Sequence, residues 1–124
     1  IVAGIVIHKE NPTGYSFDSN AGYIAYADST QNPRNNNGVI YVGAVFPASL
    51  NAAKAQLFPE AERKEHGGAL GHVLGISDYE PGTEYVYYWG SGWSKYGFAA
   101  DTEWTKYLEN FVQQVRNPLT VTVK

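Results

Sequence analysis

The residues best suited to chemistry lie in one aromatic stretch, EYVYYWGSGWSKYG, which runs from Glu84 to Gly97. Glycines at its centre interrupt strand pairing, so we expect Trp93, Lys95 and Tyr96 to follow on a loop. An indole and a phenol beside an ammonium group suit an amphipathic ligand with an apolar face and a ring of hydroxyls or a carboxylate, such as a sugar or a uronate. Trp89 would flank the same site. The competing interpretation places Trp93 in the core, beneath a helix.

The first part of this stretch reads as a strand, in which successive side chains point to opposite faces. Tyr85, Tyr87 and Trp89 therefore share one face, which is wholly aromatic. Aromatic residues favour strands and bury large areas, so the simpler interpretation packs this face against a helix or another sheet.

Two histidines are candidates for proton transfer. His66 closes a charged segment at KEHGG, where two glycines let the backbone bend, and His72 alternates with apolar residues along a strand. Each has a simpler interpretation: His66 lies on a solvated face with nearby glutamates, and His72 is a neutral imidazole with one satisfied hydrogen bond. His8, at the end of the first strand, is expected to be exposed. Without HxH or HExxH spacing and without cysteine, the sequence predicts neither a metal site nor a cofactor.

Carboxylates near a turn are a weaker signal. Glycoside hydrolysis needs two acids on opposite sides of the bond, about 5–10 Å apart. Asp78, Glu80 and Glu84 flank one turn and could approach one another, but carboxylates in turns are usually only solvated. The sequence contains no nucleophile elbow, phosphate-binding glycine loop or Ser/His/Asp pattern.

Strands make up most of the elements that must position these residues. Runs of apolar and β-branched residues predict strands over residues 1–7, 22–28, 39–46 and 68–79. A polar loop is expected over residues 29–38, and residues 47–68 read as a long excursion with one irregular helical turn. The EPGT sequence predicts a type II turn, which would pair the strand over residues 68–79 with EYVYYW as a hairpin.

One amphipathic helix is predicted over residues 101–116. Its apolar stripe follows the helical period and consists of Trp104, Tyr107, Leu108, Phe111, Val112 and Val115. The LTVTV sequence then alternates apolar and polar residues, which predicts a last strand over residues 119–123. The expected fold is mostly β: an antiparallel β-sandwich with one C-terminal amphipathic α-helix before the last strand.

The composition indicates one globular domain over residues 1–124, since 44% of the residues are hydrophobic and only 17% are charged. The net charge is −3 and the basic residues are scattered, which argues against nucleic acid as a partner. No apolar run approaches the roughly 18 residues of a membrane span. The chain starts within a strand-like run and lacks methionine, so we expect it to be a fragment of a longer protein.

Several segments together resemble a known family. The sequence YEPGTEYVYYWGSGWSKYGF, an acidic entry into a Trp-bearing helix, and VRNPLTV are similar to the C-terminal half of the bacterial domain-of-unknown-function family DUF4861. The earlier segments AGIVIHKE, GYIAYAD and GVIYVGAVFP resemble strands that precede this half. The resemblance covers nearly the whole chain, and YYWGSGWSK with the NPL ending is its most specific part.

The resemblance implies a longer, secreted or periplasmic bacterial parent, found among genes for degrading pectin, that binds or processes fragments of uronate-containing polysaccharides. It also implies a galactose-mutarotase-like supersandwich, with sugar sites on a concave sheet. A chain of this length would leave sheet edges unpaired, so we expect association with the missing N-terminal portion or with a second copy. Two function classes follow: a carbohydrate-processing protein, with Trp93 stacking on the sugar and His66 or His72 transferring protons, and a non-catalytic carbohydrate-binding or structural module.

Overall fold

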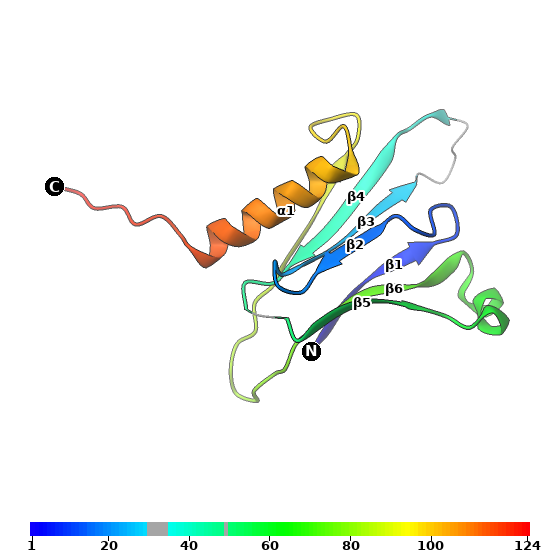
Figure 1. The fold of residues 1–124 in the computed structure, drawn as a ribbon, viewed down its shortest axis with the longest axis horizontal. Coiled ribbons are helices and arrows are strands. Elements are labelled where there is room, and N and C mark those ends of the chain that lie inside the picture. Colours follow the sequence, from blue (N-terminus) through cyan, green and yellow to red (C-terminus); the bar gives the residue numbers. More distant parts are fainter. Residues whose placement is uncertain (30–34, 49) are drawn as a thin grey trace.

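The computed structural model describes residues 1–29, 35–48 and 50–124, which form two antiparallel sheets and a C-terminal helix (Figure 1). In chain order the elements are β1 (Val2–His8), β2 (Tyr15–Asp18), β3 (Tyr23–Ser29), β4 (Val39–Val45), β5 (Ala52–Leu57), the 3-10 helix η2 (Glu60–His66), β6 (Ala69–Ile76), β7 (Tyr88–Trp93) and α1 (Asp101–Arg116). The smaller sheet has the order β1–β6–β5 and the larger sheet β2–β3–β4–β7. The mostly β, sandwich-like fold expected from the sequence is confirmed. Residues 30–34 of the expected polar loop and residue 49 of the expected excursion lie outside the described residues.

The two sheets pack face to face around an inter-sheet core. Its buried side chains come from both sheets and the segment after β4: Ile7, Ile24, Tyr26, Ala44, Phe46, Leu50 and Val73. Within a strand these positions are two residues apart, as for Ile24 and Tyr26, because alternate side chains share a face. The period of two in the sequence therefore specifies which face each strand buries.

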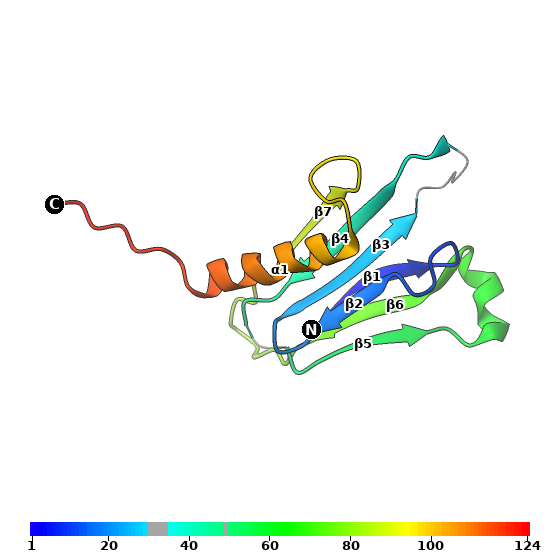
Figure 2. The same cartoon turned by 45° about the horizontal axis from the view of Figure 1, so that its top comes forward.

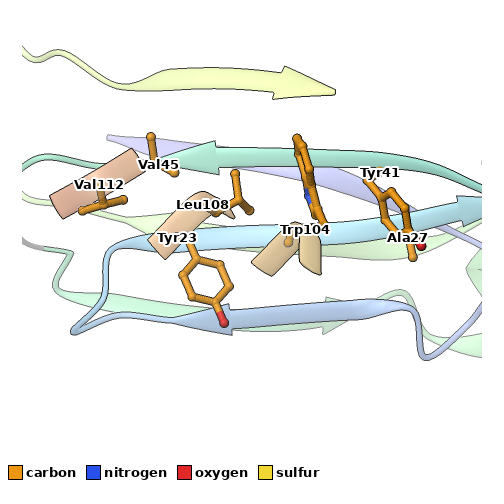
Figure 3. Packing of buried hydrophobic residues seen from close by; sticks show 8 residues of the cluster. Tyr23, Ala27, Tyr41, Val45, Trp104, Leu108 and Val112 are labelled. Carbon is orange, nitrogen blue, oxygen red and sulfur yellow. The ribbon is translucent and has the colours of Figure 1, made fainter. Parts of the chain in front are cut away.

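The helix α1 covers the opposite face of the larger sheet. Trp104, Leu108 and Val112, spaced four residues apart along the predicted stripe, are its buried side chains (Figure 3). On the sheet they pack with Tyr23, Ala25, Ala27, Tyr41 and Val45. The larger sheet is thus held between a helix and a second sheet, and this fixes the position of β4.

The hairpin expected between residues 68–79 and EYVYYW is wrong, although its turn forms. Gly82 has a φ of 86° and the Thr83 N–H donates to the Glu80 carbonyl at 3.1 Å, as a type II turn requires. The chain then crosses to the other sheet, where β7 pairs antiparallel with β4 and Trp89 lies opposite Ala44. A turn reverses the chain locally, whereas the burial of apolar faces decides which strands pair.

The expected excursion contains a strand that the sequence pattern did not reveal. Its first part forms β5, the edge strand paired with β6, and its second part forms η2, the irregular helical turn that was expected. The β5 sequence AAKAQL is rich in helix-forming residues, so pairing with β6 overrides its local preference.

The last strand expected after α1 is also wrong. Residues 119–123 form no strand, and Leu119, Val121 and Val123 are 85–96% exposed. This tail runs away from the sheets (Figure 2). Alternation in a sequence specifies the two faces of a strand, but a strand also needs a free edge beside it, and the tail reaches none.

Three buried tyrosines make the fold sensitive to alkaline pH. Burial raises the pKa of the Tyr23, Tyr26 and Tyr41 phenols above the ordinary value of 10.0. Each phenol therefore holds its proton more tightly in the folded chain than in the unfolded chain. The stability from this difference is fully present below pH 10.0 and is lost as the pH rises through the folded pKa.

We therefore expect the free energy of unfolding, measured by urea denaturation, to be lower at about pH 11 than at about pH 9. The Tyr41→Phe variant removes one of the three phenols and should show a smaller decrease. Equal stability at the two pH values would contradict the assignment.

Candidate functional site

A groove of about 350 Å³ lies between β1, whose outer edge has no partner strand in the described part of the chain, and the inter-sheet face of β4 and β7. Residues 2–5 of β1 and 42–44 of β4 line it, together with Ile24, Tyr87 and Trp89. None of these side chains is charged. We call this feature the β1–β7 groove, and its volume is within the range of small-ligand sites.

Strand register directs Trp89 toward the groove. Trp89 pairs with Ala44, and directly opposite residues of antiparallel strands project on the same face. Ala44 belongs to the inter-sheet core, so Trp89 lies on that side, while its neighbour Tyr88 turns to α1 and packs against Phe111 at 5.5 Å between ring centroids. The smaller sheet ends at β1 and leaves the Trp89 side chain 79% exposed.

Tyr87 forms a second aromatic part of the groove lining. Its ring stacks on Phe46 with centroids 5.7 Å apart and planes at 17°, and 43% of the residue stays exposed. Tyr85 packs against the inter-sheet core and its hydroxyl lies 2.5 Å from that of Ser77. The prediction that Tyr85, Tyr87 and Trp89 share one face is therefore confirmed, although β7 itself begins only at Tyr88.

Trp93 is the last residue of β7 rather than a loop residue, because the glycines at positions 90 and 92 pair with β4 instead of interrupting it. Adding a Cβ to Gly92 would place it 2.7 Å from Phe98, so the close packing beneath α1 requires glycine there. Trp93 pairs with Ile40 and lies on the same side of the strand as Trp89, about 13 Å further along.

Hydrogen bonds hold the end of β7 and the turn after it against residues 36–39. The Trp93 indole N–H donates to the Asn37 carbonyl at 2.7 Å, and the Lys95 ammonium donates to the Asn36 carbonyl. Trp93 is 43% exposed, so its ring is not enclosed, whereas Tyr96 is 82% exposed beside it. Both candidate polar groups therefore already bond the backbone.

The two candidate histidines lie elsewhere and close to each other. The Phe58 ring stacks on His66 at 3.9 Å between centroids and meets His72 edge-on at 5.4 Å. Val73 is buried between the sheets, so its neighbour His72 points to the outer face of the smaller sheet. The histidines and the β1–β7 groove are thus on opposite faces of this sheet.

Residues 1–121 match the family model of a domain of unknown function, DUF4861. The chain belongs to the DUF4861 family. Comparisons of the DUF4861 chain with curated proteins and with solved structures found no match.

The described part of the DUF4861 chain holds no group of three or more His, Cys, Asp or Glu side chains that could bind a metal ion. Nor does any helix within that part have the length and apolar character needed to cross a membrane. What the arrangement offers chemically is an uncharged aromatic surface for an apolar ligand face, with polar groups beyond the end of β7.

Proposed function

We propose that this DUF4861 domain binds carbohydrate in the β1–β7 groove, with Trp89 as the platform on which a pyranose ring stacks. The observation that carries the proposal is the 79% exposure of an indole on a strand that is itself held by β4. A large aromatic ring on a rigid element at the mouth of an apolar groove is suited to a ligand with one apolar face.

The other aromatic residues extend the proposed surface toward the end of β7. Trp93 lies on the same side as Trp89, and Tyr96 follows it in the turn, so a ligand of more than one sugar ring would reach both. An ammonium group has three donors, which leaves Lys95 two protons for a uronate carboxylate while one bonds Asn36. A uronate-containing, pectin-type oligosaccharide is the ligand class that fits this series.

Binding without bond cleavage is the function that the groove favours, since no Asp, Glu, His or Lys side chain is among its described lining residues. A catalytic role for His66 and His72 would require a second ligand position at Phe58, on the outer face of the smaller sheet. If pectin oligosaccharides were cleaved by the longer parent, and His66→Ala and His72→Ala abolished cleavage, the processing class would replace the binding class.

The groove is open on one side, and this favours an assembly in which further strands complete it. Among the described residues, β1 pairs only with β6, and Trp89 of β7 remains 79% exposed. Further strands added beside β1 would supply the opposite wall and extend the smaller sheet toward a supersandwich of the galactose-mutarotase kind. We propose that they come from the rest of a longer, secreted or periplasmic bacterial protein, or from a second copy.

We expect Trp89→Ala to weaken binding of oligogalacturonate by about 10- to 100-fold, or about 1–3 kcal/mol, as for an aromatic anchor. Isothermal titration calorimetry measures the affinity. Because the side chain is largely exposed, the melting temperature should change little.

Phe17→Ala is the control, since that ring is also exposed, at 39%, but lies on β2 at the opposite edge of the larger sheet and outside the proposed surface. Its effect should be at most a few-fold. Equal losses from the two variants would refute Trp89 as the platform, and a large drop in melting temperature for Trp89→Ala would make this indole a structural residue.

A further inference from the structure

Besides the β1–β7 groove, the domain has a polar cleft of about 530 Å³, which opens where the two sheets meet at the end of β1. It is lined by His8, Glu10, Asp28, Ser29 and Gly68, and it shares no lining residue with the β1–β7 groove. His8 closes β1 in the smaller sheet and Asp28 lies near the end of β3 in the larger one. Their side chains meet across the junction, with Nδ1 of His8 3.0 Å from Oδ1 of Asp28.

The backbone around this pair is fixed by buried groups. The register of β1 shifts between Ile7 and His8, a bulge-like irregularity that re-aims the His8 side chain. The buried Tyr26 hydroxyl accepts the His8 backbone N–H at 2.9 Å and donates to the Asn11 carbonyl at 2.9 Å. The Asn11 side chain in turn donates to the Ala27 carbonyl at 2.7 Å, beside Asp28.

The pairing determines which imidazole nitrogen is available. An ionised carboxylate only accepts hydrogen bonds, so the proton of a neutral His8 lies on Nδ1, where it is donated to Asp28. Nε2 is then an acceptor with a fixed orientation. Such an Asp-oriented imidazole is suited to accept a hydroxyl proton in a hydrogen bond. His8 is 39% exposed and Asp28 28%, so a ligand can reach both.

Charge selects the class of ligand. Glu10 and Asp28 carry two carboxylates into the cleft lining, and Lys9 lies nearby, with its Cε 3.9 Å from where a Cβ on Gly68 would stand. Counted over these described residues, the carboxylates outnumber the lysine, so the lining is net negative. A carboxylate ligand is disfavoured here, whereas a neutral ligand with several hydroxyl donors is accommodated.

Ser29 also lines the cleft, and its Oγ has no hydrogen-bond partner among the described residues.

From these contacts we propose that the cleft is a second binding site for a neutral polyhydroxylated ligand such as an uncharged sugar, in which Nε2 of His8, oriented by Asp28, accepts a hydroxyl proton. The site is separate from the β1–β7 groove and has the opposite preference for charge. A ligand with neutral and acidic sugars could therefore present each kind to a different part of the domain.

Nuclear magnetic resonance titration of the isotope-labelled chain tests the proposal with two probes, galactose and galacturonate, which differ in a carboxylate. Galactose should shift the resonances of the His8 imidazole Nε2 and of the His8, Asp28 and Gly68 amides. The affinity of galacturonate for this cleft should be at least about tenfold lower than that of galactose. Equal binding of the two probes at His8, or no shift from galactose, overturns the proposal. The Trp89 indole resonance reports the β1–β7 groove separately, so each site can fail independently.

Asp28→Asn is the decisive variant, because an amide can donate to Nδ1 and so moves the proton to Nε2. The nitrogen chemical shifts of the imidazole should report this change of tautomer, and galactose binding should weaken about tenfold or more. The matched control Glu62→Gln changes an exposed carboxylate on η2 and should leave both unchanged. If Asp28→Asn changes the tautomer but not galactose binding, the pair only ties the two sheets together. If that variant does not fold, the comparison of the two probes on the unchanged chain decides.

Discussion

Replacing Trp104 with alanine should lower the free energy of unfolding by about 3–5 kcal/mol, the usual cost of removing a large buried aromatic side chain. Trp104 is 3% exposed and joins the helix to the larger sheet (Figure 3). Its ring stacks on Tyr41 at 6.1 Å and meets Phe98 edge-on at 4.9 Å between centroids. The indole N–H donates to the Val42 carbonyl at 3.2 Å. Truncation would remove all of these contacts and leave a cavity. Urea denaturation measures the loss.

Tyr107→Ala on the same helix is the matched control. Tyr107 belongs to the same predicted stripe but is 47% exposed, so its loss should cost about 1 kcal/mol or less. If the two variants were equally stable, α1 would not be anchored through Trp104.

Gly71→Ala should destabilise the smaller sheet by about 3 kcal/mol, at the upper end of overpacking costs, although it adds only one methyl group. A Cβ at this position would stand 2.2 Å from the Gln56 carbonyl oxygen and 2.7 Å from the Leu57 Cα. Both are backbone atoms of the paired strand β5, which no side-chain rotation can move aside. The clash can be relieved only by separating β5 from β6, and hydrogen exchange of the β5 amides should accelerate as a result.

Gly90→Ala is the control for this substitution. It is also a strand glycine, in β7, but no atom lies within 4 Å of the added Cβ. Its effect on stability should stay within about 0.5 kcal/mol, as for substitutions without a defined contact. A loss as large as that of Gly71→Ala would mean that the general cost of a side chain, rather than the clash with β5, is responsible.

The parts of the fold that the sequence predicted were those in which apolar residues recur at the regular spacing of a helix or a strand. Leu108 and Val112 lie on an apolar stripe at helical spacing, and they are buried in α1. Ile24 and Tyr26 alternate with residues of the other face, and they are buried between the sheets. Period identifies an element and its buried face without any knowledge of the rest of the molecule.

Pairing between distant segments was not predictable in the same way. The turn around Gly82 formed as its sequence requires, yet β7 joined β4 instead of β6. The edge position beside β6 was taken by β5, whose alanines, lysine and glutamine carry little strand preference. Local signals specify turns and faces, and the choice among strand partners depends on the apolar surface of the whole chain.

In the candidate site, too, local patterns were predictable from the sequence, whereas contacts between distant segments were not. Alternation placed Trp89 on an aromatic face, but its exposure depends on where the smaller sheet ends, and no local pattern encodes this. The loop expected around Trp93 failed because glycines at two positions serve close packing against Phe98 and pairing with β4, rather than a break. The hydrogen bond between His8 and Asp28 forms only because the two sheets pack together. The spacing of the two residues in the sequence therefore does not predict it.

The pairing of β1 with β6 has a consequence for how this domain is made. Val2 lies opposite Ile76, so β1 leaves the ribosome long before its partner has been translated. Throughout that interval its run of isoleucine and valine is without a sheet to join, and such nonlocal pairing also slows folding in general. We expect the nascent chain to be captured by chaperones during this interval, and the release of the domain to coincide with the emergence of β6.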